Sequence, residues 1–223
     1  MNCILLSDDN FFALSEKQLD NYAELYKKNI GLPFRCLAHA HDITERKLRT
    51  LVDAGMIELQ VGIQTGSEKT RKLYKRGPST DKILDSVRLI NQFRTSLMPV
   101  YDFIIDNPFE DEKDLVETLQ MIQRFPKPYH LNIFSMRFFP GTELYQMARA
   151  RGLVVDEIKQ FEFAHKTHIN FIFFLYNHMP RWIMFILISR PMLAILKTRP
   201  VVSFSYSLKS GLRNMIRFLR PFK

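Results

Sequence analysis

The stretch MIELQVGIQTGS, residues 56–67, decides the fold prediction for this chain. Residues 56–63 are rich in Ile, Leu and Val and contain no proline, which predicts a strand buried on both faces. The strand is followed at once by QTGS (64–67) instead of an ordinary solvent turn. In folds built from parallel strands, ligands meet the carboxyl ends of the strands. The polar segment 64–67 is therefore a candidate binding site.

The same arrangement recurs along the chain. Further strands are predicted over 3–7, 33–40, 98–105 and 130–139. Helices are predicted over 15–31, from a cap at Asp42 or Thr44 to residue 55, and over 68–75, 80–93, 110–125 and 142–152. Five strands that are each followed by a helix imply right-handed crossovers and a parallel sheet or barrel.

The predicted strand ends share a polar, glycine-containing or proline-containing composition. They are Asp8–Asn10, His39–His41, Gln64–Ser67, Asp106–Pro108 and Arg137–Gly141. Each alone has the composition of an ordinary turn. Together they favour one shared polar site.

Several of these segments resemble those of radical SAM enzymes, in the same order and spacing. They are DDNF (8–11), VGIQTGSE (61–68), KRG (75–77), FIIDNPFED (103–111) and FFPGTELY (138–145). The resemblance covers residues 2–155 and is greatest to the branch that often carries an N-terminal cobalamin-binding domain. It implies an α/β fold: a partial (β/α) TIM-like barrel that lacks its first β/α unit, followed by an α-helical C-terminal tail.

The resemblance also implies cofactors and site residues. The cofactors are S-adenosylmethionine (SAM) and a [4Fe–4S] cluster in the complete enzyme, with cobalamin through an N-terminal domain. The complete enzyme would perform hydrogen abstraction or cobalamin-assisted methyl transfer, and no catalytic residue is assigned. The matching positions are Asp8 and Asp9 for the SAM amino group, Gln64, Thr65 and Ser67 for ribose and carboxylate, Arg76 for the carboxylate, and Ile104 for adenine.

The chain departs from the family pattern at the cluster. The family's CxxxCxxC loop is not found in the sequence, and Cys3 and Cys36 lie in separate predicted strands, which favours buried apolar thiols. Asp102 and Asp106 stand where family members commonly have glycine. We expect a gene fragment, one half of a split enzyme or a degenerate homologue that is inactive by itself. The alternative is a non-catalytic barrel remnant that acts as a scaffold, with its tail at a membrane surface.

The positive charge is concentrated near the C-terminus. The chain holds 32 Lys/Arg and 23 Asp/Glu, of which residues 151–223 contain 12 Lys/Arg and 3 Asp/Glu. Residues 1–150 therefore hold 20 of each sign and are neutral. This shift predicts a barrel domain over 1–152 and a basic, apolar helical extension over 153–223. Polar residues and prolines interrupt the apolar runs of the extension, so none reaches the roughly 20 residues of a spanning helix.

The last residues of the extension have an amphipathic pattern. One helical face would carry Leu208, Leu212, Met215, Ile216 and Leu219. Either this face lies on anionic lipid as a peripheral contact at the inner membrane surface, or it docks on the barrel or on a missing partner half. Nucleic-acid binding is disfavoured because no recognised motif accompanies the basic residues.

Composition and histidines add weaker indications. A hydrophobic content of 46% favours a folded chain over a disordered one, and two cysteines with no signal pattern at the start favour a cytoplasmic protein. The substrate is an unknown small molecule, with the apolar tail pointing weakly to a lipid-like one. His39 and His41 could face substrate, and His165 and His168 have a helical spacing that could bind metal, although such histidines are more often structural.

Overall fold

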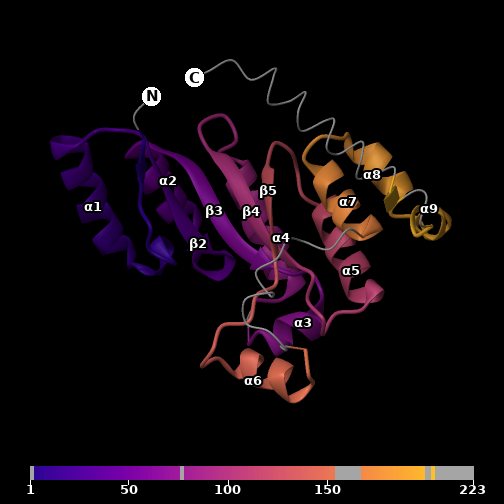
Figure 1. Ribbon diagram of the computed structural model, residues 1–223. Helices are drawn as coiled ribbons and strands as arrows, with labels where there is room; N and C mark the ends of the chain where they lie inside the picture. Colours follow the sequence, from indigo (N-terminus) through magenta and orange to yellow (C-terminus); the bar gives the residue numbers. More distant parts are fainter. Residues whose placement is uncertain (1–2, 76–77, 154–166, 199–201, 204–223) are drawn as a thin grey trace. The chain divides into compact units, whose positions relative to one another are not determined.

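The computed structural model describes residues 3–75, 78–153, 167–198 and 202–203 (Figure 1). Five strands form one sheet in chain order and curl into a half-barrel. They are β1 (Ile4–Leu5), β2 (Phe34–His39), β3 (Met56–Gln64), β4 (Met98–Ile105) and β5 (His130–Ser135). Neighbouring strands from β1 to β4 pair in parallel. The predicted partial (β/α) barrel is confirmed, with β1 and β5 shorter than the sequence indicated.

Helices follow the strands as expected. They are α1 (Glu16–Asn29), α2 (Glu45–Asp53), α3 (Glu68–Leu73), α4 (Thr80–Asn91), α5 (Glu112–Gln123) and α6 (Glu143–Ala150), with short 3-10 turns η1 (Phe11–Ala13) and η2 (Ala40–Asp42). The side chains of Ser15, Thr44 and Thr142 each accept a hydrogen bond from the N–H three residues further on. These N-caps fix the starts of three helices through local contacts.

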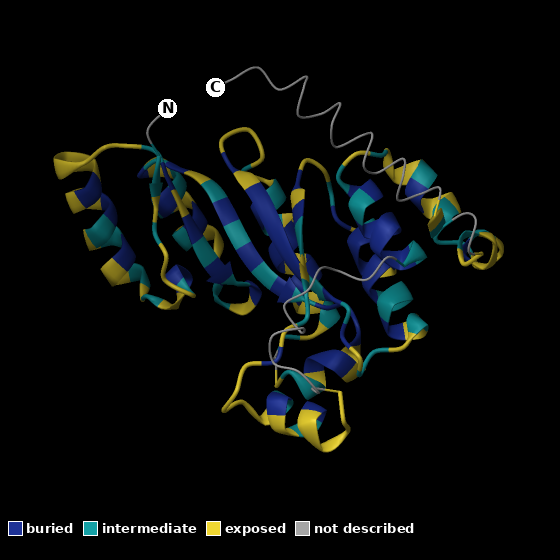
Figure 2. Cartoon of the chain, in the orientation of Figure 1, coloured by how far each residue is buried: buried dark blue, intermediate teal, exposed yellow. Residues whose placement is uncertain are grey.

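Strand β3 is not buried on both faces, which corrects the sequence-based prediction. Its Leu59, Val61 and Ile63 are buried, whereas the residues between them are only partly covered. Figure 2 shows the resulting alternation of buried and intermediate bands along β3. One face of the strand therefore meets the helix-covered core and the other is open.

The face of the sheet opposite this core carries polar side chains; it is open along β3, whereas Asp102 on β4 is buried. Arg35 on β2 forms an ion pair of 3.6 Å with Glu58 on β3. Further along, the carboxylate of Asp102 on β4 accepts hydrogen bonds from Gln60 Nε2 at 2.7 Å and from Asn132 Nδ2 at 3.0 Å. Four adjacent strands, β2 to β5, are thus joined by side chains as well as by their backbones. The opposite face holds Phe34, Cys36, Ala38, Tyr101, Phe103 and Leu131, all buried.

The chain divides into two compact units. The first comprises Met1–Ile104 and Phe109–Phe134, and the second Ile105–Pro108 and Ser135–Lys223. The boundary predicted near residue 152 falls inside the second unit. There the carboxylate of Asp106 accepts hydrogen bonds of 2.7 Å from both Ser135 Oγ and Asn170 Nδ2.

Within residues 167–198 of the C-terminal extension, the structure describes three helices. They are α7 (His168–Tyr176), α8 (Arg181–Leu187) and α9 (Arg190–Leu196). None of the helices in the described part of the chain has the length and hydropathy to span a lipid bilayer. The amphipathic pattern of residues 205–223 and His165 lie outside the described residues.

Candidate functional site

The loop after β3 has an unusual conformation at its first residue. Gln64 has a φ of 73°, in the left-handed region that non-glycine residues seldom adopt. A Cβ placed on Gly62 would lie 2.8 Å from Gln64 Nε2, so the Gln64 amide lies over the open face of the strand at Gly62. The glycine at position 62 thus makes room for the side chain of Gln64, which is only partly covered.

The two hydroxyl residues of this loop are buried. Thr65 and Ser67 are 1% and 0% exposed. Thr65 Oγ1 donates to Glu110 Oε1 at 3.0 Å, and Ser67 Oγ donates to Asp114 Oδ1 at 2.7 Å. Ser67 Oγ also accepts from the N–H of Thr70 as the N-cap of α3. In this conformation the hydroxyls hold the loop, and their predicted contact with a cofactor stays a prediction.

Glu110 and Asp114 are the two carboxyl groups that accept hydrogen bonds from these hydroxyls. Burial and hydrogen bonds shift their pKa values in opposite directions. Burial raises the pKa of Glu110, and hydrogen bonds from Thr70 and Thr65 offset only part of the rise. Burial also acts to raise the pKa of Asp114, but hydrogen bonds from Lys69, the Asp111 N–H and Ser67 outweigh it and leave that pKa below its ordinary value. Asp114 is therefore the ionised anchor of the loop.

The remaining predicted residues lie at the expected strand ends. Asp8 and Asp9 follow β1 and are exposed. Ile104 lies near the end of β4 and is partly covered. Arg76 lies outside the described residues. The described members of the set therefore offer carboxylates, one amide and one apolar side chain along the carboxyl edge of the sheet.

A pocket of about 310 Å³ lies at the ends of β2 and β3, beside α3. Its lining includes His39, His41, Arg71, Tyr74 and Lys75. The sequence indicated His39 and His41 as candidate site residues, but it did not indicate Arg71, Tyr74 or Lys75 as residues that line a pocket. Arg71 is 5% exposed, and its Nη1 donates to the Gly66 carbonyl at 3.1 Å. Burial lowers the pKa of Arg71, against the opposing effect of Glu68 and Glu117.

Nothing in the sequence distinguishes Arg71 from the basic residues around it. Segment 69–76 contains five Lys or Arg residues in eight positions, and such a run is normally solvated. Only the packing of α3 against α5 shows which of these residues is buried.

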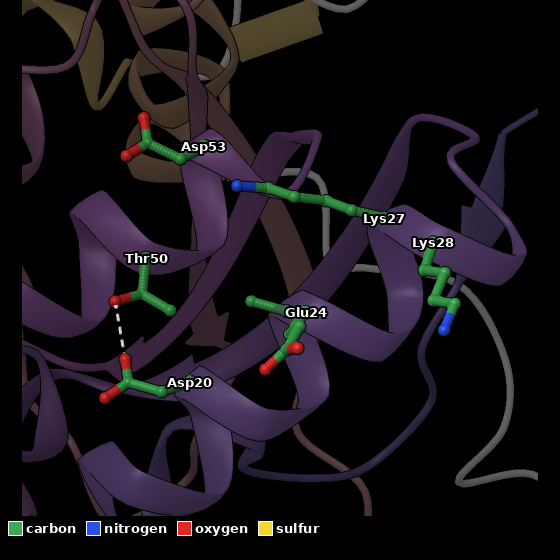
Figure 3. Close-up of a pocket in the computed structure, with 7 residues that line it drawn as sticks. Asp20, Glu24, Lys27, Lys28, Thr50 and Asp53 are labelled. Atoms are coloured by element: carbon green, nitrogen blue, oxygen red, sulfur yellow. Dashed lines mark hydrogen bonds between the residues drawn. The ribbon is translucent and has the colours of Figure 1, made fainter.

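A second, more open hollow of about 560 Å³ lies between α1 and α2 (Figure 3). Its lining carries both signs of charge, including Asp20, Glu24, Lys27 and Lys28. Asp20 is already engaged, because its carboxylate accepts from Thr50 Oγ1 at 3.1 Å and from Arg46 Nη2 at 2.8 Å. Because side chains of both charges line it, this groove selects no ligand class.

Comparison with known proteins gives one family. The sequence pattern of the Radical SAM superfamily matches residues 2–122. A tRNA-2-methylthio-N(6)-dimethylallyladenosine synthase of Orientia tsutsugamushi (strain Ikeda) is 28% identical over 127 residues, which are 55% of this chain and 27% of that protein. The synthase of the same name from Vesicomyosocius okutanii is 35% identical over 86 residues, 38% of this chain and 19% of the relative. The chain thus spans about a quarter or less of the length of these relatives.

Solved structures share the fold at low sequence identity. Elp3 of Methanocaldococcus infernus aligns with a TM-score of 0.57 and 18% identity over 81% of this chain and 46% of that one. The radical SAM methyltransferase TsrM of Kitasatospora setae aligns with a TM-score of 0.55 and 14% identity, over 69% of this chain and 31% of TsrM. Coproporphyrinogen III oxidase of Escherichia coli aligns with a TM-score of 0.54 and 17% identity, over 66% of this chain and 35% of the oxidase. Since the superfamily match covers more than half of the 223 residues and the half-barrel agrees with it, the chain belongs to the radical SAM superfamily.

Proposed function

We propose that this chain is the SAM-binding part of a radical SAM enzyme and that a segment outside these 223 residues supplies the ligands of the [4Fe–4S] cluster. The observation that carries the proposal is the row of polar strand ends on a half-barrel of this superfamily. Among them, Gln64 is held in a left-handed conformation with its amide over Gly62. Backbone strain of this kind is concentrated at ligand sites.

The thiols of this chain do not fit a [4Fe–4S] cluster. Cys36 is 0% exposed, and its Sγ lies 3.4 Å from Met56 Sδ in the core. Burial raises the pKa of the Cys36 thiol to about 12, whereas cluster ligands are thiolates. Cys3 precedes β1 and is the only other cysteine of the sequence. We therefore assign no reaction step to a cluster bound by this chain.

The residues of the strand ends do fit SAM. Exposed carboxylates at Asp8 and Asp9 can accept hydrogen bonds from its amino group, the Gln64 amide can bond ribose oxygens, and Ile104 offers an apolar contact for adenine. β1 and β4 are three strand spacings apart, about 14 Å, which an extended nucleoside joined to an amino acid can bridge. When bound beside a reduced cluster, SAM supplies the 5′-deoxyadenosyl radical of this superfamily.

The open face of the sheet favours a polar substrate over the lipid-like one that the apolar tail suggested. That face carries the Arg35–Glu58 ion pair and the Gln60–Asp102–Asn132 hydrogen bonds. An acyl chain placed over Arg35, Glu58 and Gln60, which are not buried, would take polar groups out of water and would gain little apolar contact. The relatives reported above are named for modification of an adenosine in tRNA, which is a polar substrate of this kind. We propose a substrate with hydrogen-bonding groups at the reacting end.

SAM binding to the full chain tests the proposal. Titration calorimetry should show one SAM site that Gln64→Ala weakens about tenfold, as expected for the loss of about 1.4 kcal/mol of hydrogen bonding. Gln92→Ala, which removes an exposed amide at the end of α4, is the matched control and should leave binding unchanged. No measurable SAM binding would refute the proposal and favour the scaffold alternative.

A second experiment addresses the cluster. After anaerobic treatment with iron and sulfide, this chain alone should form no 5′-deoxyadenosine from SAM and a reductant. Adding a polypeptide that carries a CxxxCxxC segment from the same genomic region should restore the product. Product from the chain alone would contradict the assignment of the cluster ligands to another segment.

Co-sedimentation with anionic liposomes tests the peripheral membrane contact separately, and binding that salt does not weaken would argue against it.

A further inference from the structure

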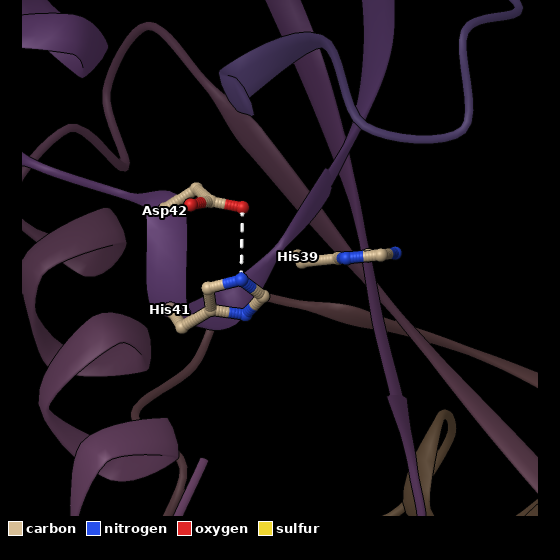
Figure 4. Close-up of side chains that lie close together, drawn as sticks. All are labelled: His39, His41 and Asp42. Carbon is tan, nitrogen blue, oxygen red and sulfur yellow. Dashed lines mark ion pairs between the residues drawn. The ribbon is translucent and has the colours of Figure 1, made fainter. Parts of the chain in front are cut away.

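Three side chains with metal-binding atoms follow one another where β2 ends. His39 is the last residue of β2, and His41 and Asp42 belong to η2 directly after it. One ligand atom of each lies within 4.8 Å of those of the other two. The two imidazole rings have centroids 5.7 Å apart. Figure 4 shows the three side chains, with His41 and Asp42 directed toward each other.

Asn10 holds this group in place. Its Nδ2 donates to Asp42 Oδ2 at 2.6 Å, and its Oδ1 accepts the backbone N–H of His39 at 3.1 Å. A single amide from the loop after β1 thus orients the carboxylate and fixes the backbone of the first histidine. Partners of this kind behind the ligands are a regular feature of metal sites, because they set the orientation of the first shell.

The distances suit a small divalent ion. His41 Nε2 and Asp42 Oδ2 are 3.1 Å apart. Two ligands at about 2.0–2.1 Å from a tetrahedral zinc ion are about 3.3 Å apart, so this pair already has the required separation. The ligand atoms of the group lie within 4.8 Å of one another, so closing the largest separation to about 3.3 Å calls for a movement of up to about 1.5 Å by one imidazole. The side chain of His41 is 51% exposed and has room to make it.

The surroundings indicate an open coordination position. His39 and His41 also line the pocket of about 310 Å³ at the ends of β2 and β3. Three protein ligands with the remaining positions turned to a pocket are the arrangement of reactive metal sites, whereas structural zinc sites are closed by four protein ligands. Arg71 and Lys75 line the same pocket, so an anionic group is the favoured exogenous ligand.

We propose that His39, His41 and Asp42 bind one divalent first-row transition metal ion, with Zn²⁺ as the reference ion. Two imidazoles and one carboxylate form a ligand set that suits Zn²⁺, Fe²⁺ and Co²⁺. The proposed ligand set contains no cysteine, so it differs from the thiolate ligands of the superfamily's iron–sulfur cluster. It does not depend on SAM binding.

Metal titration of the full chain tests this inference. The protein is freed of metal by chelation, and Zn²⁺ is titrated in competition with a chromophoric chelator, without SAM, iron or sulfide. We expect one equivalent bound, with affinity lowered about 10-fold to 100-fold by Asn10→Ala and by more in His41→Ala and Asp42→Asn. The matched control is His130→Ala, which removes an exposed histidine at the first residue of β5, and this variant should bind Zn²⁺ like the parent.

A spectrum identifies the ligands independently. Co²⁺ bound at the same stoichiometry should give ligand-field bands without a sulfur-to-metal charge-transfer band, because the proposed ligands are nitrogen and oxygen. A charge-transfer band, the absence of stoichiometric binding, or equal binding by the His41→Ala variant would each overturn the proposal. In those cases His41 and Asp42 form only a surface ion pair. Circular dichroism of each variant verifies that it is folded, so a loss of metal affinity is not a loss of structure.

Discussion

The backbone N–H of Gly66 donates a hydrogen bond of 2.8 Å to Oγ1 of Thr118. The contact joins the loop after β3 to the middle of α5, 52 residues further along the chain. Thr118 Oγ1 is shared, since it also lies 3.2 Å from Thr65 Oγ1. The loop that carries the proposed SAM contact at Gln64 is thus positioned by a helix, and changes in their contact should affect both stability and SAM binding.

Gly66→Ala should destabilise the protein by about 1–3 kcal/mol, as expected for overpacking. An added Cβ would lie 2.6 Å from Thr118 Cα, so backbone must shift. Urea unfolding followed by circular dichroism measures the effect. Gly62→Ala is the matched control, because its Cβ would meet only the flexible end of Gln64 at 2.8 Å. Equal losses of unfolding free energy in the two variants would show that contact with α5 is not the cause.

Asp114→Asn should lower the unfolding free energy by about 1–3 kcal/mol at pH 7, because an amide nitrogen cannot accept the hydrogen bonds made to the carboxylate. Asp114 Oδ2 accepts from Lys69 Nζ at 2.6 Å and from the Asp111 N–H at 2.9 Å. Lys69→Ala is the milder comparison, since the side chain of Lys69 is 59% exposed.

The pH dependence of the Asp114 effect follows from its lowered pKa. A depressed carboxyl pKa stabilises the fold above the unfolded value of about 3.9, and this contribution is lost as the pH falls through the native pKa. The difference in unfolding free energy between parent and Asp114→Asn should therefore be full at neutral pH and should shrink in acid below about pH 4. A difference that stays constant down to pH 3 would contradict the ionised anchor.

Local signals in the sequence predicted much of the fold. Helices α1, α2 and α6 begin where Ser15, Thr44 and Thr142 indicated, because a cap bonds a residue three positions away. Strand β3 was found from its apolar residues. Its two different faces were missed because residues 56–63 were judged by their apolar content as a whole, although the run contains Glu58 and Gln60. Polar side chains at every second position are in fact the pattern of a strand with one open face.

The geometry of the site could not be predicted in the same way. Ser67 is buried because Asp114 receives its hydroxyl, and these two residues are 47 positions apart. Arg71 is buried, with its Nη1 on the Gly66 carbonyl, at a pocket that it shares with residues from the ends of β2 and β3. Such contacts depend on how distant elements pack, which a single sequence does not show. The resemblance predicted strand ends for the candidate site but not the orientation of its side chains, and the site itself stays a prediction.

Asp102→Asn should stabilise the protein at neutral pH and remove part of its pH dependence. Burial raises the pKa of Asp102, and hydrogen bonds from Gln60 and Asn132 offset only part of the rise. A carboxyl group whose pKa is higher in the native than in the unfolded protein stabilises the fold at pH values below its unfolded pKa. This stabilisation is lost as the pH rises through its native pKa. The gain from Asp102→Asn should therefore grow between pH 4 and pH 8 in urea unfolding. The Gln60 amide can turn over to bond the new side chain.

Asp102→Leu is the companion variant. It removes the charge but leaves the amides of Gln60 and Asn132 without their acceptor, so it should destabilise the protein by about 1–3 kcal/mol. A stability of Asp102→Asn that is lower than that of the parent at pH 8 would show that the ionised carboxylate is preferred, with its hydrogen bonds outweighing burial.

Cys36 should resist alkylation and disulfide exchange in the folded protein. Its side chain is fully buried, and burial raises its pKa from 9.0 to about 12, which lowers the thiolate fraction at pH 8 about 1,000-fold. Ellman's reagent should therefore titrate one thiol, Cys3, in native protein and two after guanidinium unfolding. Cys3→Ser should leave none that reacts in the native state. If Cys36 reacted as quickly as Cys3, the thiol would be accessible, and its exclusion as an iron–sulfur ligand would lose its physical basis.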